Sequence, residues 1–155
     1  MRFAAASLLA CLAVAAGGCG NQGESTPVAC LEGAAAYEKA LQGAPGEVLL
    51  GGETPIGDCL ATNQQPGDLA RVGEAMIDAA TTLNTKGREG DHRAALELGY
   101  LVGAARRGAA DSEGIHSDLL RRLTVAARYA PAEQPLPPAF FRAYRTGYAA
   151  GQSNG

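Results

Sequence analysis

Apolar residues recur three or four positions apart over most of the chain, which is the spacing of one face of an α-helix. Between residues 68 and 87 the apolar stripe consists of Leu69, Val72, Met76, Ala80 and Leu83. The same spacing predicts helices over 29–41, 68–87, 91–107, 111–129 and 139–151. Because nearly all of the chain after residue 66 fits this pattern, the sequence predicts an all-α bundle of about four to five helices.

Glycine and proline interrupt the helical pattern between the first and second predicted helices. Residues 46–67 form an irregular segment in which the sequence EVLL is at most one short strand. Asp68 is placed to cap the second predicted helix. The proline-rich run 131–138 ends the fourth helix and predicts a stiff, extended spacer. We expect one helical domain over 29–152.

Two pairs of glycines lie inside predicted helices, Gly99 with Gly103 and Gly147 with Gly151. A glycine inside a helix costs about 1 kcal/mol relative to alanine, so a compensating gain is expected. Close approach of two backbones is the simplest such gain, since helices with small facing residues pack nearer than usual. The sequence therefore predicts that the two glycine stripes face each other.

Glycines on inner faces could instead leave room for a small apolar or aromatic ligand, such as haem or a lipid. Tyr144 and Tyr148 lie near the second glycine pair. His116 falls at the centre of the apolar face of the fourth predicted helix, where it could contact such a ligand. A single histidine on an apolar face is more often a core residue bonded to a carbonyl or carboxylate, and both interpretations stay open.

The start of the chain predicts export. Arg2 precedes an apolar and small-residue run of 16 residues, 3–18, which is typical of a secretory signal and too short to cross a bilayer. The sequence AGGC at residues 16–19 resembles the lipobox of bacterial lipoproteins, although Ala16 stands where that family usually has leucine. The resemblance implies cleavage after residue 18 and diacylation of Cys19. An ordinary cleaved signal, or a rival box ending at Cys11, is the alternative.

Residues 19–28 are polar and charge-poor, which is typical of a flexible tether. Cys30 and Cys59 are the cysteines that remain in the mature chain. An even pair in an exported protein predicts a disulfide, and the alternatives are a metal site or two free thiols. The sequence thus predicts localisation on the outer side of the cell membrane, held by an acyl anchor at Cys19.

The net charge of the chain and the motifs it lacks disfavour several classes of function. The chain of 155 residues has a net charge of −3, which does not favour a nucleic-acid-binding domain. The second half is nevertheless basic and could face anionic lipid headgroups. The stronger interpretation is that its arginines complement helix dipoles, because they lie in the later turns of predicted helices: Arg106, Arg107, Arg121, Arg122 and Arg128. No phosphate loop, nucleophile elbow or metalloprotease motif occurs. Glu74 and Asp78 share a helix face, which is most simply solvated.

These observations predict a lipid-anchored, non-catalytic envelope protein that acts as an interaction or scaffold module, with no metal and no cofactor. We expect its partners to be the membrane and an envelope protein. A carrier for a small apolar or aromatic ligand is the alternative. A hydrolytic enzyme built on His116 is the third hypothesis.

Overall fold

A computed structural model describes residues 25–112, 114–128 and 135–155. The predicted signal peptide, Cys19 and most of the predicted tether lie outside the described residues. The described part is mostly helical, which confirms the predicted all-α class. In chain order its elements are η1 (Val28–Leu31), α1 (Ala34–Leu41), β1 (Leu49–Leu50), β2 (Thr54–Pro55), η2 (Ile56–Cys59), α2 (Pro66–Arg88), α3 (His92–Gly108), α4 (Ser117–Arg128) and α5 (Pro138–Asn154).

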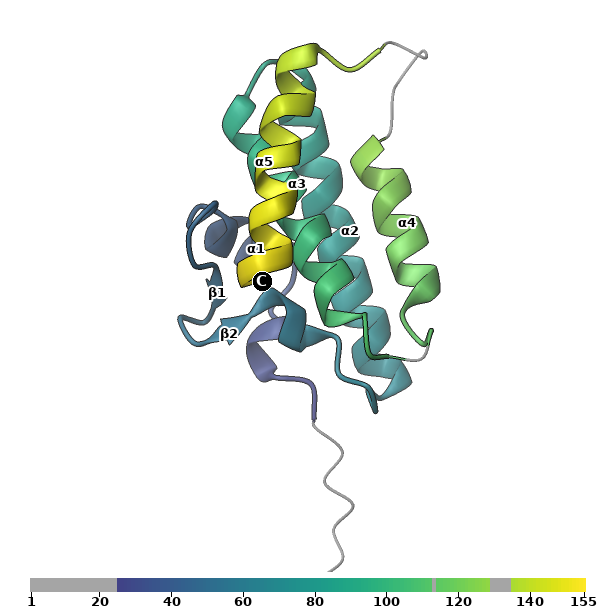
Figure 1. Cartoon of the computed structure of the whole chain (residues 1–155). Coiled ribbons are helices and arrows are strands. Elements are labelled where there is room, and N and C mark those ends of the chain that lie inside the picture. Colours follow the sequence, from purple (N-terminus) through teal and green to yellow (C-terminus); the bar gives the residue numbers. More distant parts are fainter. Residues whose placement is uncertain (1–24, 113, 129–134) are drawn as a thin grey trace, which may run out of the picture.

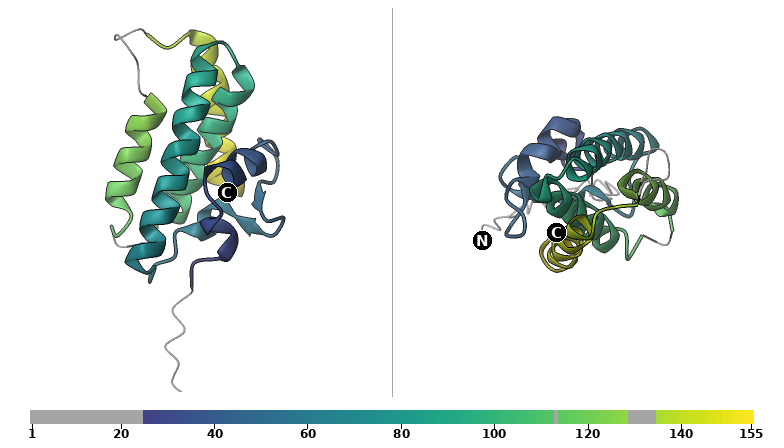
Figure 2. Two further views of the ribbon diagram at one scale, coloured as in Figure 1. Left: turned by 180° about the vertical axis from the view of Figure 1, so that it is seen from behind. Right: turned by 90° about the horizontal axis from the view of Figure 1, so that it is seen from above.

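The long helices α2 and α3 form the centre of a bundle (Figure 1). A short turn joins them, so they run antiparallel, and α5 lies along α3. The helix α4 packs mainly on α2, on the side opposite to α1 and the small hairpin (Figure 2). The hairpin is a two-stranded antiparallel sheet of β1 and β2. In the described part of the chain, no helix is both long and apolar enough to span a membrane.

The helix starts follow local rules only in part. The carboxylate of Asp91 accepts hydrogen bonds from the backbone amides of Arg93 and Ala94 and so caps the start of α3. The prediction for α2 is wrong, because Pro66 occupies the first turn and the helix begins there rather than after Asp68. Asp68 lies within that first turn, where its negative charge still favours the positive end of the helix dipole.

The first predicted helix is split. Residues 29–41 form η1 and α1, separated at Gly33, whose φ of 88° lies in the left-handed region. The structured part also begins earlier than predicted. Thr26, assigned by composition to the tether, is buried and accepts a hydrogen bond from the Gln64 amide.

The predicted disulfide between Cys30 and Cys59 is confirmed, with its two Cα atoms 5.5 Å apart. It joins η1 to η2 and so fastens the irregular segment to the start of the domain. Both cysteines are fully buried, and the Tyr37 hydroxyl donates to the carbonyl of Cys30 beside them. Burial also raises the pKa of Tyr37, so this phenol stays a protonated donor.

The contact between α3 and α5 is the most extensive contact between two helices in the molecule. An added Cβ at Gly99 would overlap the carbonyl oxygen of Tyr144, and one at Gly103 would overlap that of Tyr148. In the other direction, Gly147 lies on the backbone of Leu96. Residue numbers rise together along both helices, so α3 and α5 run parallel. We call this contact, made by Gly99, Gly103, Gly147 and Gly151, the glycine seam.

The helix α3 is buried more completely than its sequence predicts. Tyr100 is fully buried. The charged residue Glu97 is also buried and accepts a hydrogen bond from Arg93 at 2.9 Å. The reason is that α1, η2 and α5 all pack against α3, which the helical pattern of α3 alone does not reveal.

Candidate functional site

The glycine seam leaves no space for a ligand. At Gly151 an added Cβ would overlap the carbonyl oxygen of Tyr100, as at the other three positions of the seam. The glycines therefore bring two backbones together instead of lining a slot. This corrects the part of the carrier hypothesis that placed a ligand between the glycine-lined helices.

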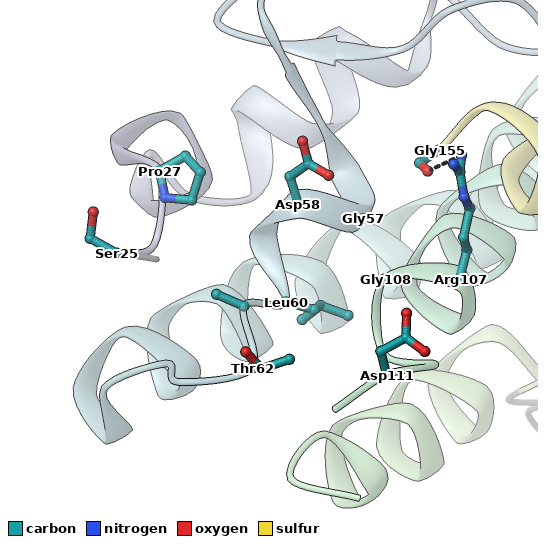
Figure 3. A pocket seen from close by; sticks show the side chains of 11 residues that line it. Ser25, Pro27, Gly57, Asp58, Leu60, Thr62, Arg107, Gly108, Asp111 and Gly155 are labelled. Carbon is teal, nitrogen blue, oxygen red and sulfur yellow. Dashed lines mark hydrogen bonds between the residues drawn. The ribbon is translucent and has the colours of Figure 1, made fainter. Parts of the chain in front are cut away.

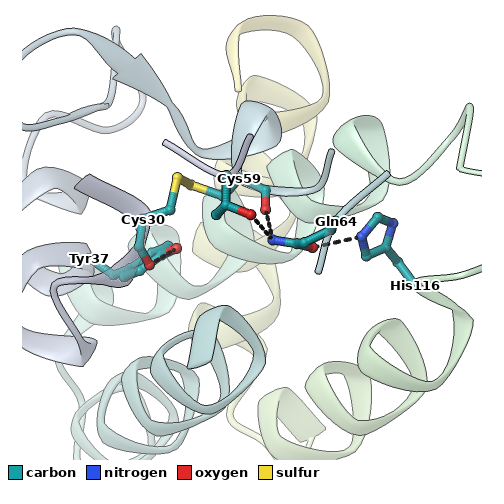
Figure 4. The surroundings of a disulfide bond; sticks show 6 residues. Cys30, Tyr37, Cys59, Gln64 and His116 are labelled. Atoms are coloured by element: carbon teal, nitrogen blue, oxygen red, sulfur yellow. Dashed lines mark hydrogen bonds between the residues drawn. A yellow bond between two sulfur atoms is a disulfide. The ribbon is translucent and has the colours of Figure 1, made fainter. Parts of the chain in front are cut away.

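His116 is not on the helix where the sequence placed it. The fourth helix begins at Ser117, six residues later than predicted, and His116 lies in the preceding turn. Its side chain is fully buried. Figure 4 shows the ring directed toward Gln64. The ring nitrogen Nε2 lies 3.0 Å from Oε1 of Gln64, whose amide nitrogen contacts the carbonyl of Cys59 at 2.9 Å.

This network defines the protonation state of His116. The Gln64 amide nitrogen donates to Thr26 and to Cys59, so the Gln64 oxygen can only accept. His116 must then carry its proton on Nε2, and burial lowers the pKa of the ring and favours the neutral form. The residue thus links the start of α4 to the segment before α2. Its position supports the interpretation of a core histidine over that of a ligand contact.

A cleft of about 440 Å³ lies between α3, α4 and α5. It is lined by Val102, Arg106, Thr124, Arg128, Tyr144, Arg145, Tyr148 and Ala149. We call it the arginine–tyrosine cleft. Tyr144 and Tyr148, two of the three residues predicted to bind a ligand, line it, whereas His116 does not. The structure therefore brings the two tyrosines together and leaves the histidine apart.

The tyrosines belong to a row of rings along α5. Phe140, Tyr144 and Tyr148 follow one another at intervals of four residues, with ring centroids 6.2 and 6.3 Å apart and nearly parallel planes. Gly87 of α2 makes room for the first ring, because an added Cβ there would meet Phe140. At the other end, the guanidinium of Arg106 lies 6.0 Å from the ring centre of Tyr148, a cation–π arrangement.

Three arginines from three helices converge on this cleft. Arg106 comes from the last turns of α3, Arg128 from the last turn of α4, and Arg145 from the middle of α5. Among the described residues no carboxylate lines the cleft, and none of these arginines forms an ion pair. The cleft is therefore strongly positive, although the chain as a whole is acidic.

The tyrosine hydroxyls are hydrogen-bond donors in this setting. Burial raises the pKa of Tyr144, and the positive charges of Arg128 and Arg106 only partly oppose that rise. The phenol consequently stays protonated near neutral pH. The cleft thus offers N–H and O–H donors beside the buried apolar side chain of Val102.

A second pocket, of about 640 Å³, opens where η2 meets the end of α3 (Figure 3). Its charged side chains are Asp58, Arg107 and Asp111. Arg107 already donates to the carbonyls of Ser153 and Gly155 at the end of α5. This pocket holds both positive and negative side chains, and Arg107 is already hydrogen-bonded within the protein. Its charge therefore favours no class of ligand as clearly as that of the arginine–tyrosine cleft does.

Comparison with protein-family models, curated proteins and solved structures found no match for this chain. The site is therefore interpreted from its own residues. Among the residues that the structure describes, no three histidine, cysteine or acidic side chains are grouped so that they could hold a metal ion.

Sequence reasoning missed the three arginines of the cleft. The signal was present, because the second half of the chain is basic and acidic residues are few there. Arg106 and Arg128 lie near predicted helix ends and were explained mainly by helix dipoles, and Arg145 was given no role. Only the arrangement of α3, α4 and α5 shows that Arg106, Arg128 and Arg145 share one cleft.

Proposed function

We propose that this protein is an exported, lipid-anchored protein of the cell envelope that acts without catalysis as an interaction or scaffold module. The buried Cys30–Cys59 disulfide carries the proposal of export, since such bonds persist in oxidising compartments. The lipobox-like sequence supports an anchor at Cys19. Two acyl chains there would give stable attachment to a membrane.

The environment of His116 supports a non-catalytic function. A hydrolytic site would have to be built on this residue, but its ring is fully enclosed and one nitrogen is bonded to Gln64. A general base needs to reach the substrate directly or through one water. The enclosed ring does not meet that requirement.

The arginine–tyrosine cleft is the face that we propose for interaction. Arginine and tyrosine are enriched in protein interfaces because each combines apolar area with hydrogen bonding. The glycine seam supports this role indirectly, since it fixes α5 rigidly on α3. Arg106, Tyr144 and Tyr148 therefore project from a firm framework.

A small-ligand carrier is the second candidate, and the volume of the cleft favours it. Its volume of about 440 Å³ lies in the range that small-molecule sites occupy. In this version the ligand occupies the cleft beside the seam and contacts Tyr144 and Tyr148.

Substitution of Cys19 tests the anchor. We expect Cys19→Ala to move the protein from the membrane fraction to the soluble extracytoplasmic fraction and to abolish labelling by radioactive palmitate. Cys11→Ala is the matched control and keeps both properties. Membrane retention and labelling of the Cys19→Ala protein would refute the proposed anchor.

A photo-reactive residue at Thr124, inside the cleft, separates the two candidates. The interaction module predicts a cross-linked product with one defined envelope protein, which the same probe at Arg142, outside the cleft, does not form. The carrier predicts no such product and instead a small molecule that co-purifies in native mass spectrometry. Cross-linking of equal strength from both positions would contradict the cleft as the interaction face.

A further inference from the structure

The arginine–tyrosine cleft contains hydrogen-bond donors that suit an anion, and three of its lining residues are positively charged. The cations Arg106, Arg128 and Arg145 reach it from three different helices. Within the described ranges no carboxylate lines it to compensate them. Such a cluster of like charges is unfavourable without a partner, so a bound anion would stabilise it.

The number and arrangement of donors favour a phosphate group over a carboxylate. A phosphate monoester carries nearly two negative charges and three terminal oxygens, which can accept hydrogen bonds from several directions. A carboxylate carries one charge and is satisfied by a single two-pronged arginine contact. Three guanidinium groups, each a planar fork of donors, therefore match the phosphate better.

The size of the cleft indicates more than a free ion. About 440 Å³ exceeds the space that one phosphate group occupies, and Val102 and Ala149 supply apolar surface beside the arginines. The ligand accordingly combines a phosphate with an organic body.

We propose that the arginine–tyrosine cleft binds the phosphate group of an organic phosphate monoester, with Arg106, Arg128 and Arg145 as its cationic contacts. This inference rests on the second candidate function, a non-catalytic carrier whose ligand occupies the cleft, and names the class of that ligand. The hydroxyls of Tyr144 and Tyr148 supply further donors to the phosphate or to the organic body. The phosphate can belong to a soluble ester or to the headgroup of a lipid in the membrane that holds the anchor.

Calorimetric titration of the full chain in a non-ionic detergent tests the proposal and separates the two sources. Glycerol 3-phosphate represents the soluble ester, dihexanoyl phosphatidic acid represents the lipid, and glycerol is the uncharged control probe. Equal binding of both phosphates indicates recognition of a soluble ester, and binding of phosphatidic acid alone indicates a lipid ligand. Absence of binding by both, or equal binding of glycerol, overturns the proposal.

Paired variants on α5 place the binding in the cleft. We expect Arg145→Gln to weaken phosphate binding at least tenfold, because it removes one of three cationic contacts. Arg142→Gln makes the same charge change on the same helix outside the cleft and should change the affinity less than twofold. Equal weakening by both variants would mean attraction by general surface charge and would overturn the proposal.

A second pair on α4 keeps the test independent of α5. Arg128→Gln should weaken binding as Arg145→Gln does, whereas Arg122→Gln, which lies outside the cleft, should not. All four side chains are exposed, so the variants should fold normally. The outcome is independent of the Cys19 experiment, since a failed anchor leaves phosphate binding unaffected and failed binding leaves palmitate labelling unaffected.

Discussion

The helices α5 and α4 are attached to the central pair in opposite ways. At the glycine seam α5 contacts α3 backbone to backbone, and no side chain lies between them at Gly99 or Gly147. Side chains hold α4 on α2 instead, chiefly the buried Leu119 and Leu123. The first contact is close and rigid, and the second has the ordinary width of a side-chain core.

This difference explains where the cleft lies. Because the seam uses only one face of α5, the neighbouring face with Tyr144, Arg145 and Tyr148 is left to line the cleft. Because α4 packs mainly on α2, its residues Thr124 and Arg128 line one side of the cleft and face residues of α5 on the other. Close packing on one face of α5 thus leaves a neighbouring face free to line the cleft.

The largest effect should come from filling the seam. Gly147→Ala puts a methyl group onto the backbone of Leu96, which no change of rotamer can relieve. We expect the free energy of unfolding to fall by about 3 kcal/mol or more, despite the better helix propensity of alanine. Urea denaturation of the disulfide-intact protein measures it.

Gly67→Ala is the matched control for that substitution. Gly67 lies in the first turn of α2, with no atom within 4 Å of an added Cβ. The control should be neutral or slightly stabilising. Equal losses from Gly67→Ala and Gly147→Ala would contradict the close contact of α3 and α5.

The attachment of α4 should depend on pH through His116. Burial lowers the pKa of His116 in the folded protein, whereas the unfolded chain has the ordinary value near 6.5. Below pH 6.5 the unfolded state therefore binds more protons, and stability falls as the pH falls toward the folded pKa. The slope due to this group reaches about 1.4 kcal/mol per pH unit.

The variant His116→Gln isolates this contribution, because glutamine keeps an N–H donor for Gln64 but does not titrate. We expect a lower stability at pH 7.5 and a flatter decline between pH 6.5 and 5. His92→Gln, at the exposed start of α3, should keep the wild-type decline. An unchanged slope in His116→Gln would mean that other groups govern the acid sensitivity.

A glycine under α4 should respond in the opposite sense to Gly147. An added Cβ at Gly73 would lie 3.4 Å from a terminal methyl group of Leu119, which is ordinary contact with a flexible side chain. Gly73→Ala should therefore stabilise the protein by about 0.5–1 kcal/mol through its helix propensity. A loss as large as that of Gly147→Ala would show that α4 is as tightly packed as α5.

The sequence predicted the seam because its glycines follow the helical period on both helices. Gly99, Gly103, Gly147 and Gly151 are costly in helices, and that cost pointed to backbone contact. The disulfide was equally accessible, since Cys30 and Cys59 were the pair left once Cys11 and Cys19 were assigned to the predicted signal and anchor. Local composition and spacing determine both features.

The cleft and the surroundings of His116 could not be predicted in this way. The start of α4 depends on the buried Gln64 network, and residues 114–116 form a turn although they carry helical spacing. The burial of Tyr100 depends on elements that pack against α3, among them α1 and η2, which are distant in sequence. Each of these features is set by tertiary contacts that a helical wheel does not contain.

The smallest expected effect concerns the stability of the empty cleft. Arg145 lies among like charges and, in the described part of the chain, forms no ion pair. Arg145→Gln should therefore raise the free energy of unfolding by a few tenths of a kcal/mol at low salt, and 1 M salt should remove the gain because it screens exposed charges. Arg142→Gln, on the same helix outside the cleft, should show no comparable gain. A loss of stability in Arg145→Gln would instead mean that Arg145 contributes to the packing of α5. The face of α5 that packs on α3 could then no longer be distinguished from the face that lines the cleft.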